Sequence, residues 1–203
     1  MFLQEILTGL NYLGILAFSI SGSLKAFEKK LDLLGVLVLG FSTALAGGIV
    51  RDVLLGVFPP TSLREVQPPL IAILGSIITV LLYRQLRKIH MAILIADAVG
   101  LGAFTATGAE IGLEHGLNLL GTAMIASLTA VGGGVLRDLL SNEIPIVLKR
   151  DFYATPTIIG GIVFYFLAQW FGGQTSLILT SVLVTGLRLL AMIRKWELPK
   201  VGG

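Results

Sequence analysis

The sequence predicts an all-α fold: a polytopic membrane protein with seven transmembrane helices, built as a 3+3 inverted repeat plus one extra C-terminal helix. Of its 203 residues, 55% are hydrophobic and 13% are charged, whereas about a quarter of the residues of a soluble domain are charged. Apolar stretches long enough to cross a bilayer recur along the chain. Residues 11–75 also match residues 97–161 at a constant offset of 86, and 20 of the 65 pairs are identical.

The spans follow one another with short connections. Apolar stretches fall near residues 6–24, 33–50, 69–83, 91–109, 117–136, 154–171 and 175–193. Seven helices of about 20 residues leave no room for a separate soluble domain. We therefore expect one transmembrane domain over 1–203, with a first three-helix repeat at 5–85, a second, inverted one at 91–171 and a seventh helix at 175–195. A six-helix arrangement is disfavoured, because Leu177–Ile193 is long enough to span.

The repeat itself predicts transport. Each copy holds an odd number of spans, so the second copy enters the membrane from the opposite face. Inverted repeats of this kind recur in proteins that carry solutes or ions, and the pathway lies at the repeat interface. The identical pairs include Gly14/Gly100, Phe18/Phe104, Gly22/Gly108, Gly35/Gly121, Thr43/Thr129, Gly47/Gly133, Gly48/Gly134, Arg51/Arg137, Asp52/Asp138 and Pro59/Pro145.

The distribution of lysine and arginine predicts the orientation. With loops assigned alternately, one face has Arg64 and at most Arg51, and the other collects Lys25, Lys29, Lys30, Arg84, Arg87, Lys88, Lys149, Arg150, Arg194, Lys195 and Lys200. This bias predicts an N-terminus outside and a C-terminus in the cytoplasm. The same loop cations account for the net charge of +3, so we expect no nucleic-acid partner. The N-terminal segment lacks the features of a cleaved signal peptide, so the first helix is expected to remain.

Runs of glycine interrupt the second helix of each copy. Gly47-Gly48 and Gly132-Gly133-Gly134 lie deep in apolar spans, and each glycine costs about 1 kcal/mol of helix propensity. We expect a kink or break there, whose freed carbonyl oxygens would coordinate a cation. Thr43 and Thr129 join these glycines as candidate pathway residues. The alternative is that the glycines merely let a neighbouring helix approach closely.

An Arg-Asp pair follows each glycine run, as Arg51-Asp52 and Arg137-Asp138. Each charge costs roughly 2.5–3.5 kcal/mol if it faces lipid, so the pairs must face a crevice, each other or an interface. Two interpretations stay open: ion-paired helix ends, or vestibule charges that select or gate ions.

The first helix of each copy carries a polar stripe. Ser19 and Ser23 share one helical face, and with Thr105 they are candidate pathway residues, although hydroxyls that bond back to helix carbonyls are the favoured alternative. Asp97 is either a headgroup-level residue or the cation-attracting mouth of a pore. Arg188, in the seventh helix, is expected to snorkel to the headgroups, with a pathway-lining or bracing charge as the alternative.

Other residue types exclude most further chemistry. There is no cysteine, so disulfides, thiolate metal sites and cysteine nucleophiles are excluded. His90 and His115 are expected in loops without partners at metal-ligand spacing, so we expect neither a metal site nor an enzyme. Phe18 or Phe104 could form a dewetting constriction, although packing is the favoured role.

The duplicated Gly-Gly-x-x-Arg-Asp segments, the Ser-x-Ser-Gly end of the first helix and the 3+3+1 layout resemble the prokaryotic trimeric intracellular cation (TRIC) channels. Their bacterial sequences were earlier grouped under a "glycine transporter" domain label. The resemblance covers residues 5–195. It implies a homotrimer with one pore per protomer, lined by glycine-kinked second and fifth helices, that conducts potassium and also sodium. It implies no cofactor beyond the permeant ion.

The chain departs from the family pattern at two points. Ala46 stands where the second copy has Gly132, so the first break is expected to be the milder one. Animal members carry a lysine-containing motif in the second helix and bind phosphoinositides, but no lysine lies between Leu33 and Val50, which argues against that kind of gating.

Two functions therefore stay open. The favoured one is a passive cation channel in a prokaryotic inner membrane, with membrane lipids, monovalent cations and further copies of the chain as partners. The alternative is a secondary transporter of a small amino acid such as glycine, which shares the inverted repeat. A non-transporting scaffold is disfavoured, because buried charges are an expensive way to build an anchor.

Overall fold

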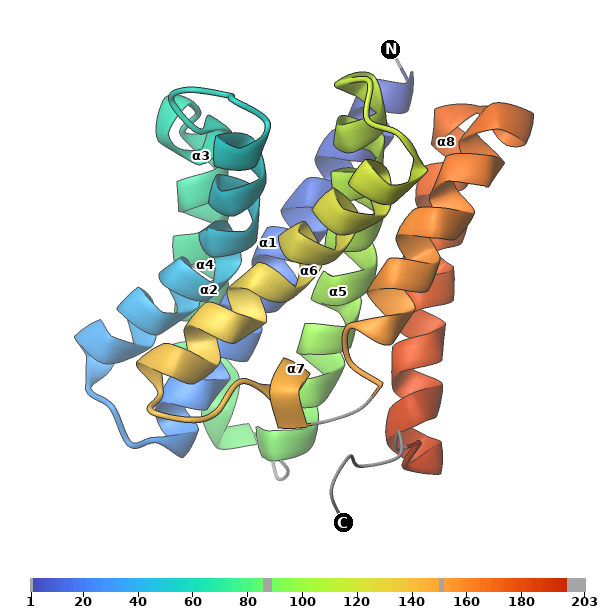
Figure 1. Cartoon of the computed structure of the whole chain (residues 1–203). Coiled ribbons are helices and arrows are strands. Elements are labelled where there is room, and N and C mark those ends of the chain that lie inside the picture. Colours follow the sequence, from blue (N-terminus) through green and yellow to red (C-terminus); the bar gives the residue numbers. More distant parts are fainter. Residues whose placement is uncertain (1, 86–88, 150–151, 197–203) are drawn as a thin grey trace.

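The computed structural model describes residues 2–85, 89–149 and 152–196, and within these ranges it is helical without strands. Figure 1 shows a bundle of long helices with short helical segments at its ends. The elements are α1 (Phe2–Glu28), α2 (Leu33–Leu54), α3 (Thr61–Arg64), α4 (Gln67–Leu82), η1 (Tyr83–Gln85), α5 (Ile89–Glu114), α6 (Leu119–Leu140), α7 (Ile146–Lys149) and α8 (Thr155–Arg194). The all-α fold is confirmed.

Seven spans result from six long helices. All six are long and apolar enough to cross a membrane, and α8 is double length. Gly172 inside α8 has φ 74° and ψ 165°, a conformation that glycine adopts readily. The chain reverses there, so α8 forms a hairpin of two spans (Figure 1). The expected seventh helix is therefore confirmed, joined to the sixth by a one-residue turn.

The two ends of the bundle are named here by the termini. The N face carries the start of α1, α3 and the turn at Gly172, and the C face carries the α1–α2 connection, α7 and the end of α8 (Figure 1). Described cations gather at the C face, where Lys29, Lys30 and Arg84 are exposed, whereas Arg64 is at the N face. Arg87, Lys88, Arg150 and Lys200 lie outside the described residues.

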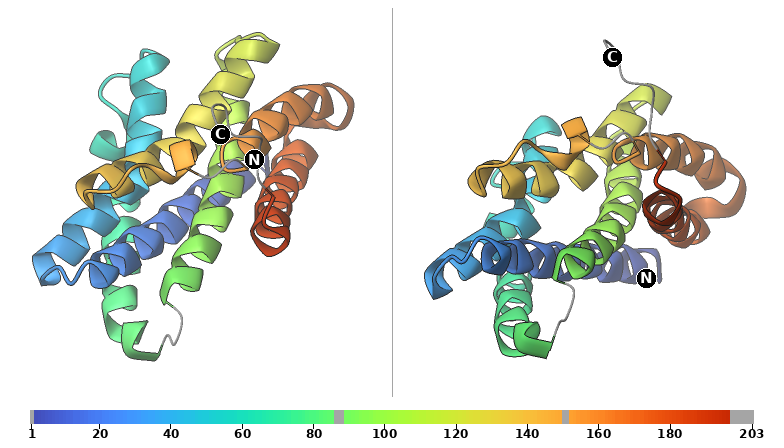
Figure 2. Two further views of the ribbon diagram at one scale, coloured as in Figure 1. Left: turned by 60° about the horizontal axis from the view of Figure 1, so that its bottom comes forward. Right: turned by 90° about the horizontal axis from the view of Figure 1, so that it is seen from below.

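The two copies pack in the same way. In the first, α1, α2 and α4 contact one another, and in the second α5, α6 and α8 do. α1 packs on α5 and α2 on α6, which leaves α4 and α8 on opposite sides of the bundle (Figure 2). The same device starts both second helices: the side chain of Asp32 accepts from the backbone N of Gly35 at 2.7 Å, and that of Asn118 from Gly121 at 2.9 Å.

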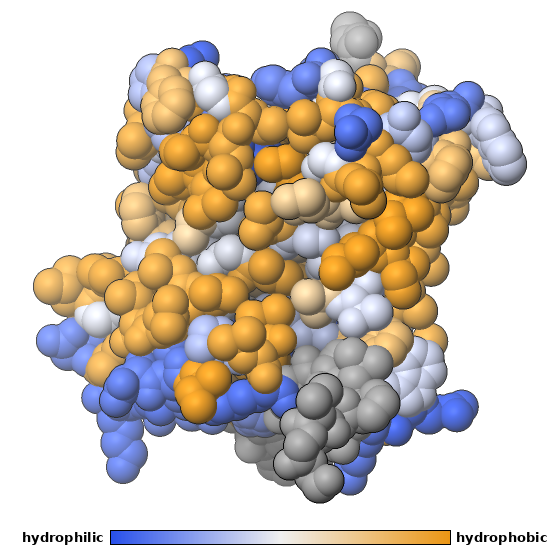
Figure 3. All heavy atoms as spheres, in the orientation of Figure 1, coloured by the Kyte–Doolittle hydropathy of each residue, from blue (hydrophilic) through white to orange (hydrophobic). Residues whose placement is uncertain are grey.

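Apolar side chains form a belt around the bundle. In Figure 3 they cover the middle of the visible face, and hydrophilic residues lie toward its two ends. Large hydrophobic residues on α4 are exposed, among them Leu70, Leu74 and Leu81. The small residue Ala72 on the opposite side of α4 is fully buried. Such a surface suits a lipid environment or contact with further membrane helices.

Of the kink or break expected in the second and fifth spans, the break is wrong and the kink stays a prediction. α2 and α6 are helical at every residue through Gly47-Gly48 and Gly132-Gly133-Gly134. In lipid, a helix that keeps its ladder leaves no backbone group unsatisfied. The glycines provide close approach between helices instead, which is the alternative that the sequence left open.

Candidate functional site

α2 and α6 cross at two glycines. A Cβ added to Gly47 would clash with the carbonyl oxygen of Thr129, and one added to Gly133 would clash with that of Thr43. These contacts are reciprocal at the offset of 86, so they lie about an internal two-fold axis. Gly132 also lies at the crossing, because its added Cβ would be 3.2 Å from Cα of Gly47. The crossing therefore holds the two copies together at the centre of the bundle.

Two phenylalanine rings fill the space beside this crossing. Phe18 and Phe104 are at most 1% exposed, and their ring centroids lie 5.3 Å apart at an interplanar angle of 44°. Each ring packs on a glycine of the other copy: Phe104 on Gly14, and Phe18 on Gly100. We call Phe18, Phe104, Gly47 and Gly133 the central block. It is apolar and closely packed.

A buried charged cluster lies on the C-face side of the central block. We call it the C-face cluster, and its members are Ser21, Asp97, Arg137, Asp138 and Tyr153. Nη1 of Arg137 donates to Oδ1 of Asp97 at 2.6 Å and to Oγ of Ser21 at 2.6 Å, and Nε donates to Oδ1 of Asp138 at 2.9 Å. The hydroxyl of Tyr153 donates to the same Asp97 oxygen at 3.1 Å. Arg137 and Asp97 are fully buried. Two carboxylates thus share one guanidinium.

Arg188 braces this C-face cluster. Its guanidinium carbon lies 4.8 Å from the centroid of the Tyr153 ring, and Nη1 donates to the carbonyl oxygen of Phe152 at 3.1 Å. The side chain is 3% exposed. The snorkelling expectation is therefore wrong, because an aromatic face and a carbonyl offer the cation a site inside the bundle. Both expectations for Asp97 are wrong too, since it is buried in an ion pair rather than placed at a mouth or among headgroups.

On the N-face side, the matching pair is arranged differently. Nε and Nη2 of Arg51 both donate to Oδ1 of Asp52, at 2.9 and 2.7 Å. Oδ2 of Asp52 accepts from the backbone N of Thr61 at 2.7 Å, as Oδ2 of Asp138 does from Ile146. Arg51 is 4% exposed but has no second carboxylate. The interpretation as ion-paired helix ends describes both Arg-Asp pairs.

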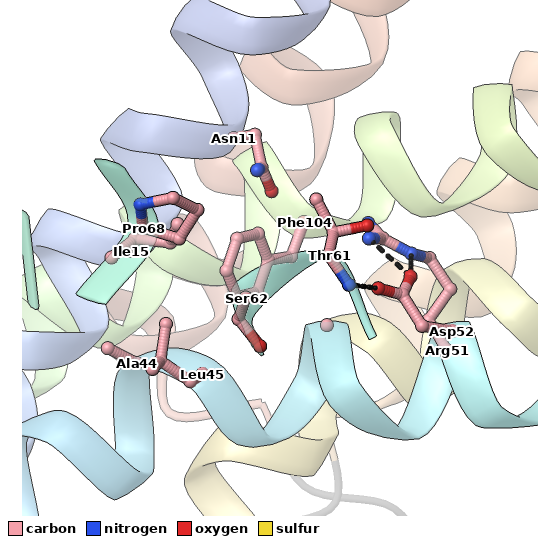
Figure 4. Close-up of a pocket in the computed structure, with 11 residues that line it drawn as sticks. Asn11, Ile15, Ala44, Leu45, Arg51, Asp52, Thr61, Ser62, Pro68 and Phe104 are labelled. Carbon is pink, nitrogen blue, oxygen red and sulfur yellow. Dashed lines mark hydrogen bonds and ion pairs between the residues drawn. The ribbon is translucent and has the colours of Figure 1, made fainter. Parts of the chain in front are cut away.

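A pocket opens beside Arg51. It is lined by Asn11, Ile15, Ala44, Leu45, Gly48, Arg51, Asp52, Thr61, Ser62, Pro68 and Phe104, and Figure 4 shows polar side chains converging at one end of it. The space inside is about 20 Å³, which is room for about one water molecule. The pocket ends on the central block at Phe104.

The candidate hydroxyls bond to helix carbonyls. Thr43, Thr105 and Thr129 each donate to the carbonyl oxygen four residues earlier, at 2.6 to 2.7 Å. Ser19 donates to the carbonyl oxygen of Ala72, and Ser23 to that of Val36 at 3.3 Å. These hydroxyls are therefore satisfied by backbone within the first or second copy.

The structure brings together most of the residues that the sequence singled out, in three groups. The helix crossing contains Gly47, Gly132, Gly133, Thr43 and Thr129. The pocket is lined by Arg51, Asp52 and Gly48. The C-face cluster contains Asp97, Arg137 and Asp138, Arg188 braces it, and Gly134 packs against its Tyr153. Sequence reasoning missed Tyr153, and it missed Ser62 and Asn11 as residues that line the pocket. Asn11 could have been found, because it pairs with Asp97 at the repeat offset.

Ion pairs at the C face connect α1 with the α6–α7 connection. Glu143, in the α6–α7 connection, lies 2.9 Å from Nζ of Lys25 and 2.7 Å from Nζ of Lys29. Hydrogen bonds and charge from Lys29 and Lys25 lower the pKa of Glu143 from its ordinary 4.5 to about 2. His90 lies in the first turn of α5 rather than in a loop, with Nδ1 3.4 Å from a Glu28 oxygen. Among the described residues, no three His, Cys, Asp or Glu side chains are placed to hold a metal ion.

Comparison with known proteins identifies the family. A family model described as "Glycine transporter" matches residues 8–84 and 94–169. The UPF0126 inner membrane protein YadS of Escherichia coli K12 is 39% identical over 155 residues, which cover 76% of this chain and 75% of that protein.

Two solved structures share the fold over nearly the whole chain. One, described as "Structural basis for conductance through TRIC cation channels", is 46% identical with a TM-score of 0.86 over 96% of both chains. Another, described as "Crystal structure of a prokaryotic TRIC channel in 0.5 M KCl", is 41% identical with a TM-score of 0.91, over 96% of this chain and 100% of that one. The chain therefore belongs to the glycine-transporter domain family and, within it, to the prokaryotic TRIC channel family.

Proposed function

We propose that the protein is a channel for monovalent cations, potassium and also sodium, with one pathway in each protomer. The pathway would run from the N-face pocket past the central block to the C-face cluster, between α1 and α2 of the repeat at 5–85 and α5 and α6 of the repeat at 91–171. The observation that carries this proposal is the central block itself: apolar rings lie between two buried charged clusters, on the internal two-fold axis. Membership of a family with solved cation channels supports it.

The physical mechanism would be passive. A cation leaving water needs replacement oxygens, and the carbonyls of Thr43 and Thr129 lie at the crossing. Parting of α2 and α6 would turn these oxygens toward a hydrated path. The rings of Phe18 and Phe104 would act as a dewetting gate while the helices remain in contact.

We further propose a trimer in a prokaryotic inner membrane, with the N face outside and the C face in the cytoplasm. The family name supports the trimer, and the inner-membrane relative YadS supports the location. The cation-rich C face supports this orientation, because cytoplasmic loops carry an excess of lysine and arginine.

The functional test is a reversal potential. Purified protein in a planar bilayer between asymmetric KCl solutions should show unitary currents that reverse near the potassium equilibrium potential. Anion preference, or the absence of conductance, would reject the channel. The second candidate, a carrier of a small amino acid, is favoured by the family description, and it predicts saturable, gradient-coupled uptake without unitary steps.

The pathway can be tested with single cysteines, because the natural chain has none. Gly48→Cys places a thiol in the pocket, where an added Cβ has no atom nearer than 3.9 Å. Applied while the channel conducts and its helices are parted, a water-soluble methanethiosulfonate reagent should reach this thiol and reduce the current. Met124→Cys, at a side chain 63% exposed on the surface of α6, is the matched control and should leave the current unchanged. An unaltered current in modified Gly48→Cys would place the pathway elsewhere.

A further inference from the structure

The N-face pocket contains buried hydrogen-bond donors without partners. Nη1 of Arg51 and Oγ of Ser62 have no hydrogen-bond partner within the described ranges, although their residues are only 4% and 8% exposed. Both residues line the pocket together with Asn11 (Figure 4). Buried donors are normally paired, because leaving them unpaired costs free energy. The pocket therefore offers donors to a bound acceptor.

The Asp52 carboxylate beside Arg51 is already used as an acceptor. Oδ1 of Asp52 accepts two hydrogen bonds from Arg51, and Oδ2 accepts from the backbone N of Thr61. The carboxylate thus balances the guanidinium on one side only. What remains toward the pocket is a guanidinium nitrogen, a hydroxyl and the side-chain amide of Asn11. A charged guanidinium nitrogen forms its strongest hydrogen bonds with anionic acceptors.

The second copy contains the acceptor that the first copy lacks. Asp97 occupies the position that pairs with Asn11 at the repeat offset, and its carboxylate accepts from Nη1 of Arg137 at 2.6 Å. Arg137 also donates to Ser21, whose counterpart Thr107 is buried with no hydrogen-bond partner among the described residues. Nη2 of Arg137 also has no hydrogen-bond partner among the described residues. At this position the second copy therefore has a carboxylate beside its arginine that the first copy lacks.

The geometry points to a small-anion site in the N-face pocket, where chloride or a one-carbon carboxylate such as formate takes the place beside Arg51 that the Asp97 carboxylate holds beside Arg137. Nη1 of Arg51 donates to the anion, and Ser62 and Asn11 are further polar residues of the pocket lining. The space of about 20 Å³ is room for about one water molecule, so the site suits the smallest anions. A larger anion such as gluconate does not fit.

Binding of this anion regulates the entry of cations from the N face, an inference that rests on the proposed function. A cation that enters from the N face passes the guanidinium of Arg51, and a bound anion screens that charge. Anion binding itself does not depend on conduction, so it is tested first without measuring current.

The binding test uses thermal unfolding of the purified protein in detergent. Potassium gluconate is replaced by KCl or by potassium formate at constant potassium concentration and ionic strength. The unfolding midpoint of the wild type should rise and saturate with chloride and with formate, because a ligand that binds only the folded state stabilises it. The order of the two apparent affinities tells whether the site prefers a halide or a carboxylate. Equal midpoints in all three salts would overturn the proposal and leave water as the occupant.

Two substitutions at one position locate the site. Asn11→Asp supplies the carboxylate internally, so the apparent affinity for chloride should fall at least about tenfold, as expected when a like charge occupies the binding position. Asn11→Ala is the matched control: it removes the amide without adding charge and should keep a saturable response. An Asn11→Asp response equal to that of the wild type would overturn the proposal.

A direct measurement covers the case in which Asn11→Asp fails to fold. Wild-type crystals grown in bromide should show an anomalous peak beside the guanidinium of Arg51, and its absence would also overturn the proposal. None of these readouts involves current. A protein that binds chloride but does not conduct would refute the channel and keep the anion site.

Discussion

Two adjacent glycines of α2 should respond in opposite ways to the same substitution. A Cβ added to Gly47 would fall well inside 3.0 Å of the Thr129 carbonyl oxygen, a backbone atom that cannot rotate away. A Cβ added to Gly48 has nothing nearer than Nη2 of Arg51, at 3.9 Å. Gly47→Ala must therefore push two helices apart, while Gly48→Ala requires no movement.

The size of the effect is obtained by comparing the unfolding free energies of the two variants. Alanine regains about 1 kcal/mol of helix propensity at either position, so this contribution cancels in the comparison. Inserting a methyl group into a closed contact costs about 1–3 kcal/mol. Gly47→Ala should therefore be about 1–3 kcal/mol less stable than Gly48→Ala. By the internal two-fold axis, Gly133→Ala should match Gly47→Ala, because its Cβ meets the Thr43 carbonyl oxygen.

The assay is reversible unfolding in mixed micelles with increasing mole fraction of sodium dodecyl sulfate, followed by circular dichroism. Each variant yields a free energy of unfolding from the midpoint and slope. If Gly47→Ala proves as stable as Gly48→Ala, α2 and α6 are not in backbone contact at this point, and the central block does not exist as described.

Three further predictions test the other parts of the site. Phe104→Leu should raise the open probability in bilayer recordings, because a smaller apolar side chain weakens the dewetting barrier; an unchanged open probability would remove the rings from the gate. Tyr153→Phe should cost about 1.5–3 kcal/mol of unfolding free energy in the same micelle assay, since it deletes a hydrogen bond to a charged group, Asp97; a neutral effect would contradict that bond.

The third concerns pH. The pKa of Glu143 is lowered to about 2, so its stabilising contribution is fully present above its ordinary pKa of 4.5 and is lost as pH falls toward 2. Because the side chain is 29% exposed, solvent screening limits this contribution to about 1 kcal/mol. The difference in unfolding free energy between wild type and Glu143→Gln should therefore be constant from pH 5 to 8 and should decline to zero between pH 4.5 and 2. If the difference at pH 3 is as large as that at pH 7, the ion pairs are contradicted.

The sequence was sufficient for the architecture, because span length and repeat parity are properties of the chain alone. It could not decide what the glycine runs do. A break and a close helix contact both favour glycine at Gly47 and Gly133, and the two differ only in what lies opposite each Cα. In the structure a backbone carbonyl of the other copy lies there, and no local pattern encodes that distance.

Arg188 and Tyr153 show a second limit. The position of Arg188 near the end of its span favoured a snorkelling cation, with a bracing charge as the alternative. The choice depends on the ring of Tyr153, which reaches the same place from the start of α8's hairpin and is 1% exposed. Tyr153 pairs with Gln67 at the repeat offset, so comparison of the copies marks the position as different but does not give its contacts.

The differences between the copies explain why the two halves of the proposed pathway are unequal. Asp97 and Tyr153 fill the C-face half with an ion pair and a ring, whereas their counterparts Asn11 and Gln67 leave a pocket in the N-face half. Opening between the copies would leave Arg137 with Asp97 and Asp138, because all three belong to the second copy, but it would separate Arg137 from the hydroxyl of Ser21 in α1. The guanidinium then needs a replacement acceptor such as water, since an unpaired buried donor is costly, so hydration of this cluster and parting of the helices are expected to occur together.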